Sequence, residues 1–138
     1  MRIVLSFQTL YNAPTPEEYI KLRIKAGLSL KDPEASKIAL QNSIFAVTLR
    51  SEDTVIGMGR IIGDGGCFYQ IVDIAVDPEY QGNGLGKTIM SELINYLDEH
   101  APAHSYVSLI ADLPADQLYK KFGFDYTQPR SVGMYKKY

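Results

Sequence analysis

The chain has only one cysteine, Cys67, among its 138 residues, which excludes a disulfide within the chain. No stretch approaches the roughly 20 apolar residues that a membrane-spanning helix needs. The opening residues also lack the apolar core and the small-residue cleavage site of a signal peptide. These absences predict a cytoplasmic protein that does not span a membrane.

An excess of positive charge is missing as well. The 14 Lys and Arg residues are scattered and are outnumbered by 16 Asp and Glu, so the formal net charge is −2. Proteins that bind nucleic acid or anionic membranes carry a basic patch, so neither partner is expected. With 46% hydrophobic residues, the chain can bury one core but has no room for a second, and we take residues 1–138 as a single domain.

The hydrophobic pattern predicts an α/β domain with a mixed sheet. Alternation predicts a first strand at 2–7, and helix-start signals predict two short helices, from Pro16 and from Asp32. The other expected elements are three strands in a meander between residues 43 and 76, a helix from near Gly84 to His100, a strand at 105–111, a short helix at 114–122 and a last strand at 131–138.

Three glycines stand at every second position between the third meander strand and the long helix: Gly82, Gly84 and Gly86, followed by Lys87 and Thr88. Glycine is usually kept where the backbone turns sharply or approaches something closely. The first turn of a helix has N–H groups without partners and a partial positive charge, so a phosphate fits there. The alternative is a tight turn without a ligand.

Two common phosphate-binding patterns do not match these glycines. A P-loop would need glycine at Gln81, and the dinucleotide fingerprint would need glycine at Lys87. The pattern that does fit is Q-x-x-G-x-G, formed by Gln81, Gly84 and Gly86 after the run DIAVDPEY.

This run closely resembles the acetyl-CoA motif of the GNAT superfamily of acyl-CoA-dependent N-acyltransferases. A second stretch, LYKKFGF at 118–124, resembles the family's late tyrosine-containing helix and the strand after it. The resemblance implies a mixed, mainly antiparallel sheet flanked by helices, with a splayed cleft for acetyl-CoA beside the strand that precedes the glycines. It also implies an N-acetyltransferase that moves an acetyl group to a primary amine by direct attack in a ternary complex, without a metal.

The resemblance assigns the cofactor contacts residue by residue. The strand backbone before the glycines would pair with the pantetheine arm, and the amides of the glycine turn would hold the pyrophosphate. Gln81 would brace the turn or reach the cofactor. The implied set is Ile74, Ala75, Val76, Gln81, Gly82, Asn83, Gly84, Leu85, Gly86, Lys87 and Thr88.

Two catalytic roles are also implied. Tyr119 stands where the family has its general acid, with core packing as the alternative. Gln70 stands where many members carry a glutamate base, so Asp73 is either the base, directly or through water, or a buried hydrogen-bonded carboxylate. Asp112 replaces an asparagine that contacts the cofactor arm. The departures at Gln70 and Asp112 leave open a non-catalytic acyl-CoA-binding module.

The amine acceptor is less defined. The family usually lines the acceptor side with segments that fall here at 11–43 and 63–69. Their side chains would suit an aromatic or cationic amine: Tyr11, Tyr19, Arg23, Asp64, Phe68 and Tyr69. A small molecule is favoured over a protein or peptide amine, because the chain has no room for a peptide-binding insert.

Three other residues have ordinary explanations. His100 and His104 lack the spacing of metal ligands, so they are expected at the surface and no metal site is predicted. Cys67 is expected to be a small buried residue rather than a nucleophile. The sequence leaves open whether the chain forms a homodimer.

Overall fold

The computed structural model describes residues 5–138 and contains one five-stranded sheet in the order β1-β2-β3-β4-β5. Neighbouring strands from β1 to β4 are antiparallel, and β5 is parallel to β4. The strands are β1 (Gln8–Leu10), β2 (Phe45–Ser51), β3 (Thr54–Gly63), β4 (Phe68–Val76) and β5 (Tyr106–Leu109). The mixed, mainly antiparallel sheet predicted from the sequence is therefore confirmed.

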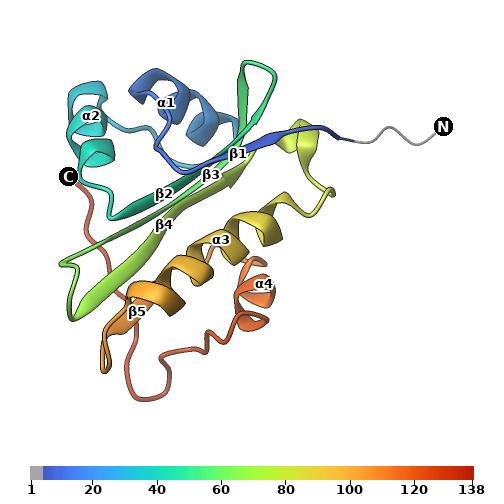
Figure 1. The fold of residues 1–138 in the computed structure, drawn as a ribbon. Helices are drawn as coiled ribbons and strands as arrows, with labels where there is room; N and C mark the ends of the chain where they lie inside the picture. Colours follow the sequence, from blue (N-terminus) through green and yellow to red (C-terminus); the bar gives the residue numbers. More distant parts are fainter. Residues whose placement is uncertain (1–4) are drawn as a thin grey trace.

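Helices cover both faces of the sheet (Figure 1). Helices α1 (Pro16–Lys25) and α2 (Pro33–Gln41) lie on one face, and α3 (Leu85–His100) and α4 (Asp116–Lys120) lie on the other. A short 3-10 helix, η1 (Pro78–Tyr80), connects β4 to the glycine turn. No helix among residues 5–138 is both long enough and apolar enough to cross a membrane.

Local signals fix the position of α1. Thr15 and Glu18 form a capping box: Thr15 Oγ1 accepts from the Glu18 N–H at 3.2 Å, and the Glu18 carboxylate accepts from the Thr15 N–H at 3.0 Å. Arg50 on β2 donates to both Glu18 oxygens at 2.6 and 2.8 Å, which ties the start of α1 to the sheet. Helix α2 begins in a similar way, with Asp32 accepting from the Ala35 N–H at 2.8 Å.

The main core lies between the sheet and α3. Leu85, Ile89, Leu93 and Leu97 repeat at four-residue spacing on α3, and this stripe is buried against residues of β2, β3 and β4. A Cβ on Gly59 would lie only 2.6 Å from Ile89 Cγ2, so glycine at this position allows β3 and α3 to approach closely. A smaller cluster on the opposite face packs α1 and α2 onto the sheet through Tyr19, Leu22, Leu40, Val55, Met58 and Ala75.

The structure differs from the prediction at the first and at the last expected strand. Of the strand expected at 2–7, residues 2–4 lie outside the described part, residues 5–7 are not in a strand, and β1 begins at Gln8. The strand expected at 131–138 is absent, and Met134 and Tyr135 are 88% and 87% exposed. Alternation specifies a strand only where one face is buried, and neither face of this segment is.

Strand β5 and helix α4, which precede residues 131–138, are shorter than predicted. Strand β5 ends at Leu109 rather than at Ala111, and α4 begins at Asp116, so Pro114 lies in the turn before the helix. Because β5 ends early, the second half of β4 has no partner on its β5 side, while it stays paired with β3 on the other.

Candidate active site

Strand β4 has a partner on its β5 side for only half of its length. Phe68–Ile71 pair with Tyr106–Leu109, and no described strand pairs with the remainder of β4 on this side. A bulge accompanies the separation: Met58 pairs with Ala75 and Arg60 with Val72, so two residues of β4 face the single Gly59 of β3. Bulges bend a strand and increase its twist, which separates β4 from β5.

A cleft of about 800 Å³ occupies this opening. One wall is the part of β4 that has no partner on its β5 side, together with Gln81. The opposite wall runs from the end of β5 to Tyr119 on α4, and the far end is formed by Arg60 with side chains of α1 and α2. The splayed cleft expected from the sequence is therefore present in the fold.

The glycine turn follows β4 after the short helix η1. Gly82 and Gly84 have φ of +85° and +74°, a region that other residues rarely adopt. Gly84 is the N-cap of α3 and provides no side-chain cap. The first backbone bond of the helix runs from the Thr88 N–H to the Gly84 carbonyl at 3.0 Å, so the N–H groups before Thr88 have no acceptor within the helix.

Side chains of the turn brace it onto β4. Gln81 Nε2 donates to the Val76 carbonyl at 3.4 Å, and Asn83 Nδ2 donates to the Tyr80 carbonyl at 2.8 Å. Leu85 is 2% exposed and belongs to the core, so only its backbone can meet a ligand.

The structure brings part of the predicted cofactor set into the cleft. Ile74, Ala75, Val76 and Gln81 line it. The other seven residues are not among its lining and follow Gln81 on the turn and the first turn of α3: Gly82, Asn83, Gly84, Leu85, Gly86, Lys87 and Thr88.

Tyr119 lines the cleft from the side opposite β4. Its ring packs into the core beside α3 and the residue is 9% exposed, yet its hydroxyl has no hydrogen-bond partner among the described residues. Burial, with a smaller contribution from the charge of Asp112, raises the pKa of the Tyr119 phenol above its usual value of 10.0. The phenol therefore keeps its proton at neutral pH and can donate it into the cleft.

Asp73 lies at the bulge and is held by three side chains. Its carboxylate accepts from the Tyr19 hydroxyl at 2.9 Å, from Arg60 Nε at 2.9 Å and from Arg23 Nη1. The side chains of Asp73 and Arg60 are each 6% exposed. Burial, and to a smaller extent the negative charge of Asp73, raises the pKa of Tyr19 to about 12. Tyr19, Arg23, Arg60 and Asp73 are called the arginine cluster below.

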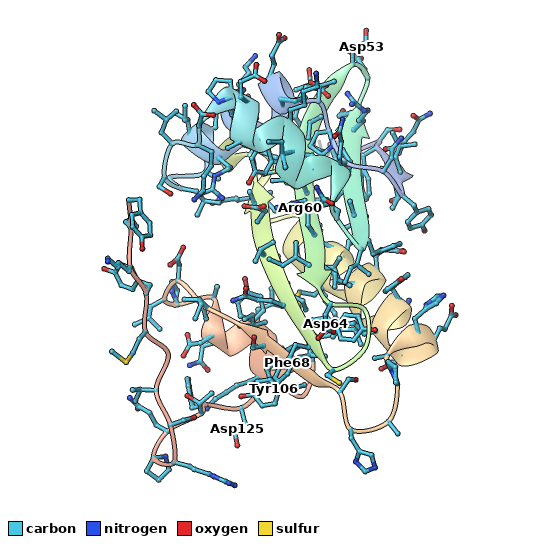
Figure 2. The ribbon with its side chains drawn as sticks, turned by 90° about the vertical axis from the view of Figure 1, so that its left-hand side faces the viewer. Asp53, Arg60, Asp64, Phe68, Tyr106 and Asp125 are labelled. Atoms are coloured by element: carbon cyan, nitrogen blue, oxygen red, sulfur yellow. The ribbon has the colours of Figure 1, made fainter. Side chains whose placement is uncertain are left out.

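Arg60 is a site residue that the sequence reasoning missed. It extends from β3 toward α1 and α2, as Figure 2 shows, and its Nη1 donates to the Ala39 carbonyl at 2.9 Å and to Ser43 Oγ at 2.8 Å. The available signal was its place as the one charged residue in the strand Thr54–Gly63. A charge inside such a run needs a partner, because burying an unpaired charge is costly.

Several residues predicted for the acceptor side lie elsewhere. Tyr19 and Arg23 line the cleft, whereas Tyr11, Phe68 and Tyr69 do not, and Tyr11 stacks on Phe45 instead. Asp64 lies at the tip of the β3–β4 hairpin, distant from Arg60 in Figure 2, and accepts three backbone N–H bonds of the turn. Those bonds hold the pKa of Asp64 below its usual value.

The structure also tests the predicted burial of Cys67 and the predicted exposure of the two histidines. Cys67 is exposed in the same hairpin, so the expectation that it is buried was wrong. His100 and His104 are exposed, as predicted. Among residues 5–138, no group of three or more His, Cys, Asp or Glu is arranged to hold a metal ion.

Comparison with known proteins identifies the family. The Acetyltransferase (GNAT) family matches residues 6–124. The structure of a "probable acetyltransferase" of unknown function from meticillin-resistant Staphylococcus aureus superposes with a TM-score of 0.93 at 52% identity, covering 96% of this chain and 100% of that one. The chain belongs to the GNAT family of acetyltransferases.

Two curated relatives extend the comparison. The chain is 35% identical over 117 residues to "GCN5-related N-acetyltransferase 2, chloroplastic" of Arabidopsis thaliana, covering 70% of this chain and 45% of that protein. It is 34% identical over 92 residues to "Uncharacterized N-acetyltransferase ycf52" of Pyropia yezoensis, covering 64% of this chain and 52% of that protein. The chain thus spans about half the length of these relatives.

Proposed function

We propose that this GNAT domain transfers the acetyl group of acetyl-CoA to a primary amine of a small molecule, by direct attack in a ternary complex. The observation that carries the proposal is the juxtaposition of three features: the half of β4 that has no partner on its β5 side and the buried Tyr119, which both line the cleft, and the glycine turn at the start of α3, which follows Gln81 of the cleft wall. Each feature supplies a different part of what the reaction needs.

The half of β4 that has no partner on its β5 side and the glycine turn would hold the donor. The backbone at Ile74, Ala75 and Val76 would pair on that side with the amide-containing pantetheine arm, as an added strand would. Beyond Gln81, the N–H groups from Gly82 to Lys87 and the Lys87 ammonium would hold the pyrophosphate, with Thr88 close behind. The thioester supplies the activated acetyl group, and the residues of the chain orient it.

The reaction forms a C–N bond to the amine and breaks the C–S bond of the thioester. The amine nitrogen must lose a proton, and the departing sulfur must gain one. We assign the second role to Tyr119, because its phenol is protonated, lines the cleft and has no partner among the described residues.

The role of Asp73 has two alternatives. As a base, it would take the proton of the attacking ammonium, directly or through water. As a structural carboxylate, it would hold Arg23 and Arg60 in place. Its three hydrogen bonds from Tyr19, Arg23 and Arg60 favour the second role, and an amine that arrives neutral needs no strong base.

Two other functions remain as alternatives: acetylation of a protein or peptide amine, and non-catalytic binding of acyl-CoA. The small molecule is preferred because the cleft ends against α1 and α2.

A cytoplasmic location stays a prediction, since the Arabidopsis relative is named as chloroplastic. Whether the chain forms a homodimer also stays open.

Calorimetry of acetyl-CoA binding, combined with a thiol-release assay over a panel of amines and lysine peptides, tests the proposal. We expect binding of acetyl-CoA and thiol release with at least one small amine. Turnover confined to peptides would support the protein-amine alternative. Binding without turnover on any member of the panel would support the non-catalytic module.

A further inference from the structure

The acceptor end of the cleft carries more positive than negative charge. Arg23, Arg60 and Lys31 line it together with a single carboxylate, Asp73. Asp112 also lines the cleft, on the β5–α4 side beside Tyr119. The two buried arginines therefore share one counterion, and this end of the cleft has a net positive charge.

The arginines also have hydrogen-bonding capacity left over. Arg60 uses Nε on Asp73 and Nη1 on Ala39 and Ser43, but its Nη2 has no acceptor among the described residues. Every fully covered side-chain nitrogen or oxygen in the described part of the chain has a partner. Arg60 Nη2 is therefore not fully covered, and Arg60 lines the cleft although the residue as a whole is only 5% exposed.

The positions of these arginines are fixed before any substrate arrives. Arg23 donates from Nε to the Ser29 carbonyl at 3.0 Å and from Nη2 to Ser29 Oγ at 3.1 Å, in addition to its contact with Asp73. An anchored guanidinium loses little conformational freedom on binding, and its planar donors match carboxylate and phosphate oxygens. A site for a neutral or cationic amine would not need two such groups.

We propose that the acceptor is an amine that also carries an anionic group, a carboxylate or a phosphate, and that Arg60 Nη2 binds this group in the arginine cluster. The cluster would hold the anion at the α1–α2 end of the cleft and leave the amine pointing toward β4. The proposal rests on the proposed function and replaces the cationic acceptor expected from the sequence. It is independent of the pyrophosphate site, which lies beyond Gln81.

Matched pairs of amines test this inference. Ethanolamine is compared with phosphoethanolamine, and phenylalaninamide with phenylalanine, in the thiol-release assay with acetyl-CoA. We expect kcat/KM to be at least about 10-fold higher for the anionic member of one pair, the effect of a single hydrogen bond to a charged group. The pair that shows the difference separates phosphate from carboxylate. Equal or higher values for both neutral members would overturn the inference while leaving the acetyltransferase proposal in place.

Arg60→Gln supplies the residue-specific test, with Arg50→Gln as its matched control. Each variant removes an arginine that ties a helix to the sheet, but Arg50 contacts Glu18 and does not line the cleft. Preference for the anionic amine should fall at least about 10-fold in Arg60→Gln, mainly through KM, and should persist in Arg50→Gln. Equal preference in both variants would overturn the role of Arg60.

A binding measurement keeps the inference testable without turnover. The same pairs are titrated by calorimetry into wild-type protein saturated with CoA. Tighter binding of an anionic member supports the inference, and equal binding of both members in each pair overturns it. If Arg60→Gln does not fold, Arg60→Lys replaces it, because lysine keeps the charge and loses the planar set of donors.

Discussion

Arg60 Nε lies 2.9 Å from Asp73 Oδ2, across the bulge that separates the free half of β4 from its paired half. This contact joins β3, which carries Arg60, to β4, which carries Asp73, at the point where the cleft opens. It also connects α1 and α2 to the sheet, because Arg23 and Tyr19 donate to the same carboxylate and Arg60 donates to the Ala39 carbonyl.

Asp73→Asn should therefore destabilise the fold. The substitution removes the negative charge opposite two buried guanidinium groups, and breaking a buried ion pair in this way costs about 3 kcal/mol or more. Urea unfolding at neutral pH should show the loss in the free energy of unfolding. A change below about 1 kcal/mol would mean that the arginines do not depend on Asp73.

The pH dependence of the same variant separates the two roles of Asp73. If Asp73 is the base, activity of Asp73→Asn should partly recover at higher pH, where more of the amine is already neutral. If Asp73 only holds the arginines, the activity of the variant should stay low at every pH at which the protein is folded. We expect the second result, measured as kcat/KM from pH 7 to 9.5.

Tyr119→Phe should reduce turnover without unfolding the domain. The ring and its packing are kept, so the free energy of unfolding should change by about 1 kcal/mol or less. Because the departing thiolate loses its proton donor, kcat should fall by roughly 100-fold or more, while acetyl-CoA affinity is nearly unchanged. Unlike loss of a base, this defect should not recover at higher pH. Wild-type kcat in Tyr119→Phe would leave core packing as the only role of Tyr119.

Asp112→Asn should shift the basic limb of the pH–rate profile to lower pH. The charge of Asp112 adds to burial in raising the pKa of Tyr119 above 10.0, so its removal lowers that pKa in part. The acid would then lose its proton at a lower pH than in the wild type. Asp116→Asn is the matched control, because Asp116 contacts Tyr126 rather than Tyr119. Identical profiles for both variants would contradict the role of the phenol as acid.

Gly84→Ala should weaken acetyl-CoA binding beyond its cost in stability. At φ of +74°, a side chain costs about 1–2 kcal/mol, and the new Cβ would project into open space at the start of α3. Gly65→Ala is a control with a similar φ of +77° in the β3–β4 hairpin. Both variants should lose similar stability in urea, and only Gly84→Ala should show weaker binding by calorimetry. Equal affinities would place the pyrophosphate elsewhere.

Local patterns were enough to predict most of the fold. Pro16 and Asp32 mark helix starts, the stripe from Leu85 to Leu97 is the buried face of α3, and Gly84 caps that helix. The predicted last strand failed because alternation at 131–138 does not report whether a face is buried, and the side chains there are exposed.

The arginine cluster could not be predicted in the same way. Tyr19 and Arg23 lie on α1, Arg60 on β3 and Asp73 on β4, so 50 residues separate Arg23 from the carboxylate that it contacts. Only the bulge and the packing of α1 on the sheet bring them together. The glycine turn, by contrast, is a contiguous motif, so its place before α3 could be predicted without the fold.

Transfer of label from acetyl-CoA to an amine is the most direct test of the proposed activity. The wild-type protein and Tyr119→Phe are incubated with acetyl-CoA carrying a ¹³C-labelled acetyl group and with the matched amine pairs, and products are identified by mass spectrometry. We predict a labelled N-acetyl product from a small amine, formed roughly 100-fold more slowly by Tyr119→Phe. Absence of any labelled amine from a wild-type protein that binds acetyl-CoA would contradict the proposed acetyltransferase activity.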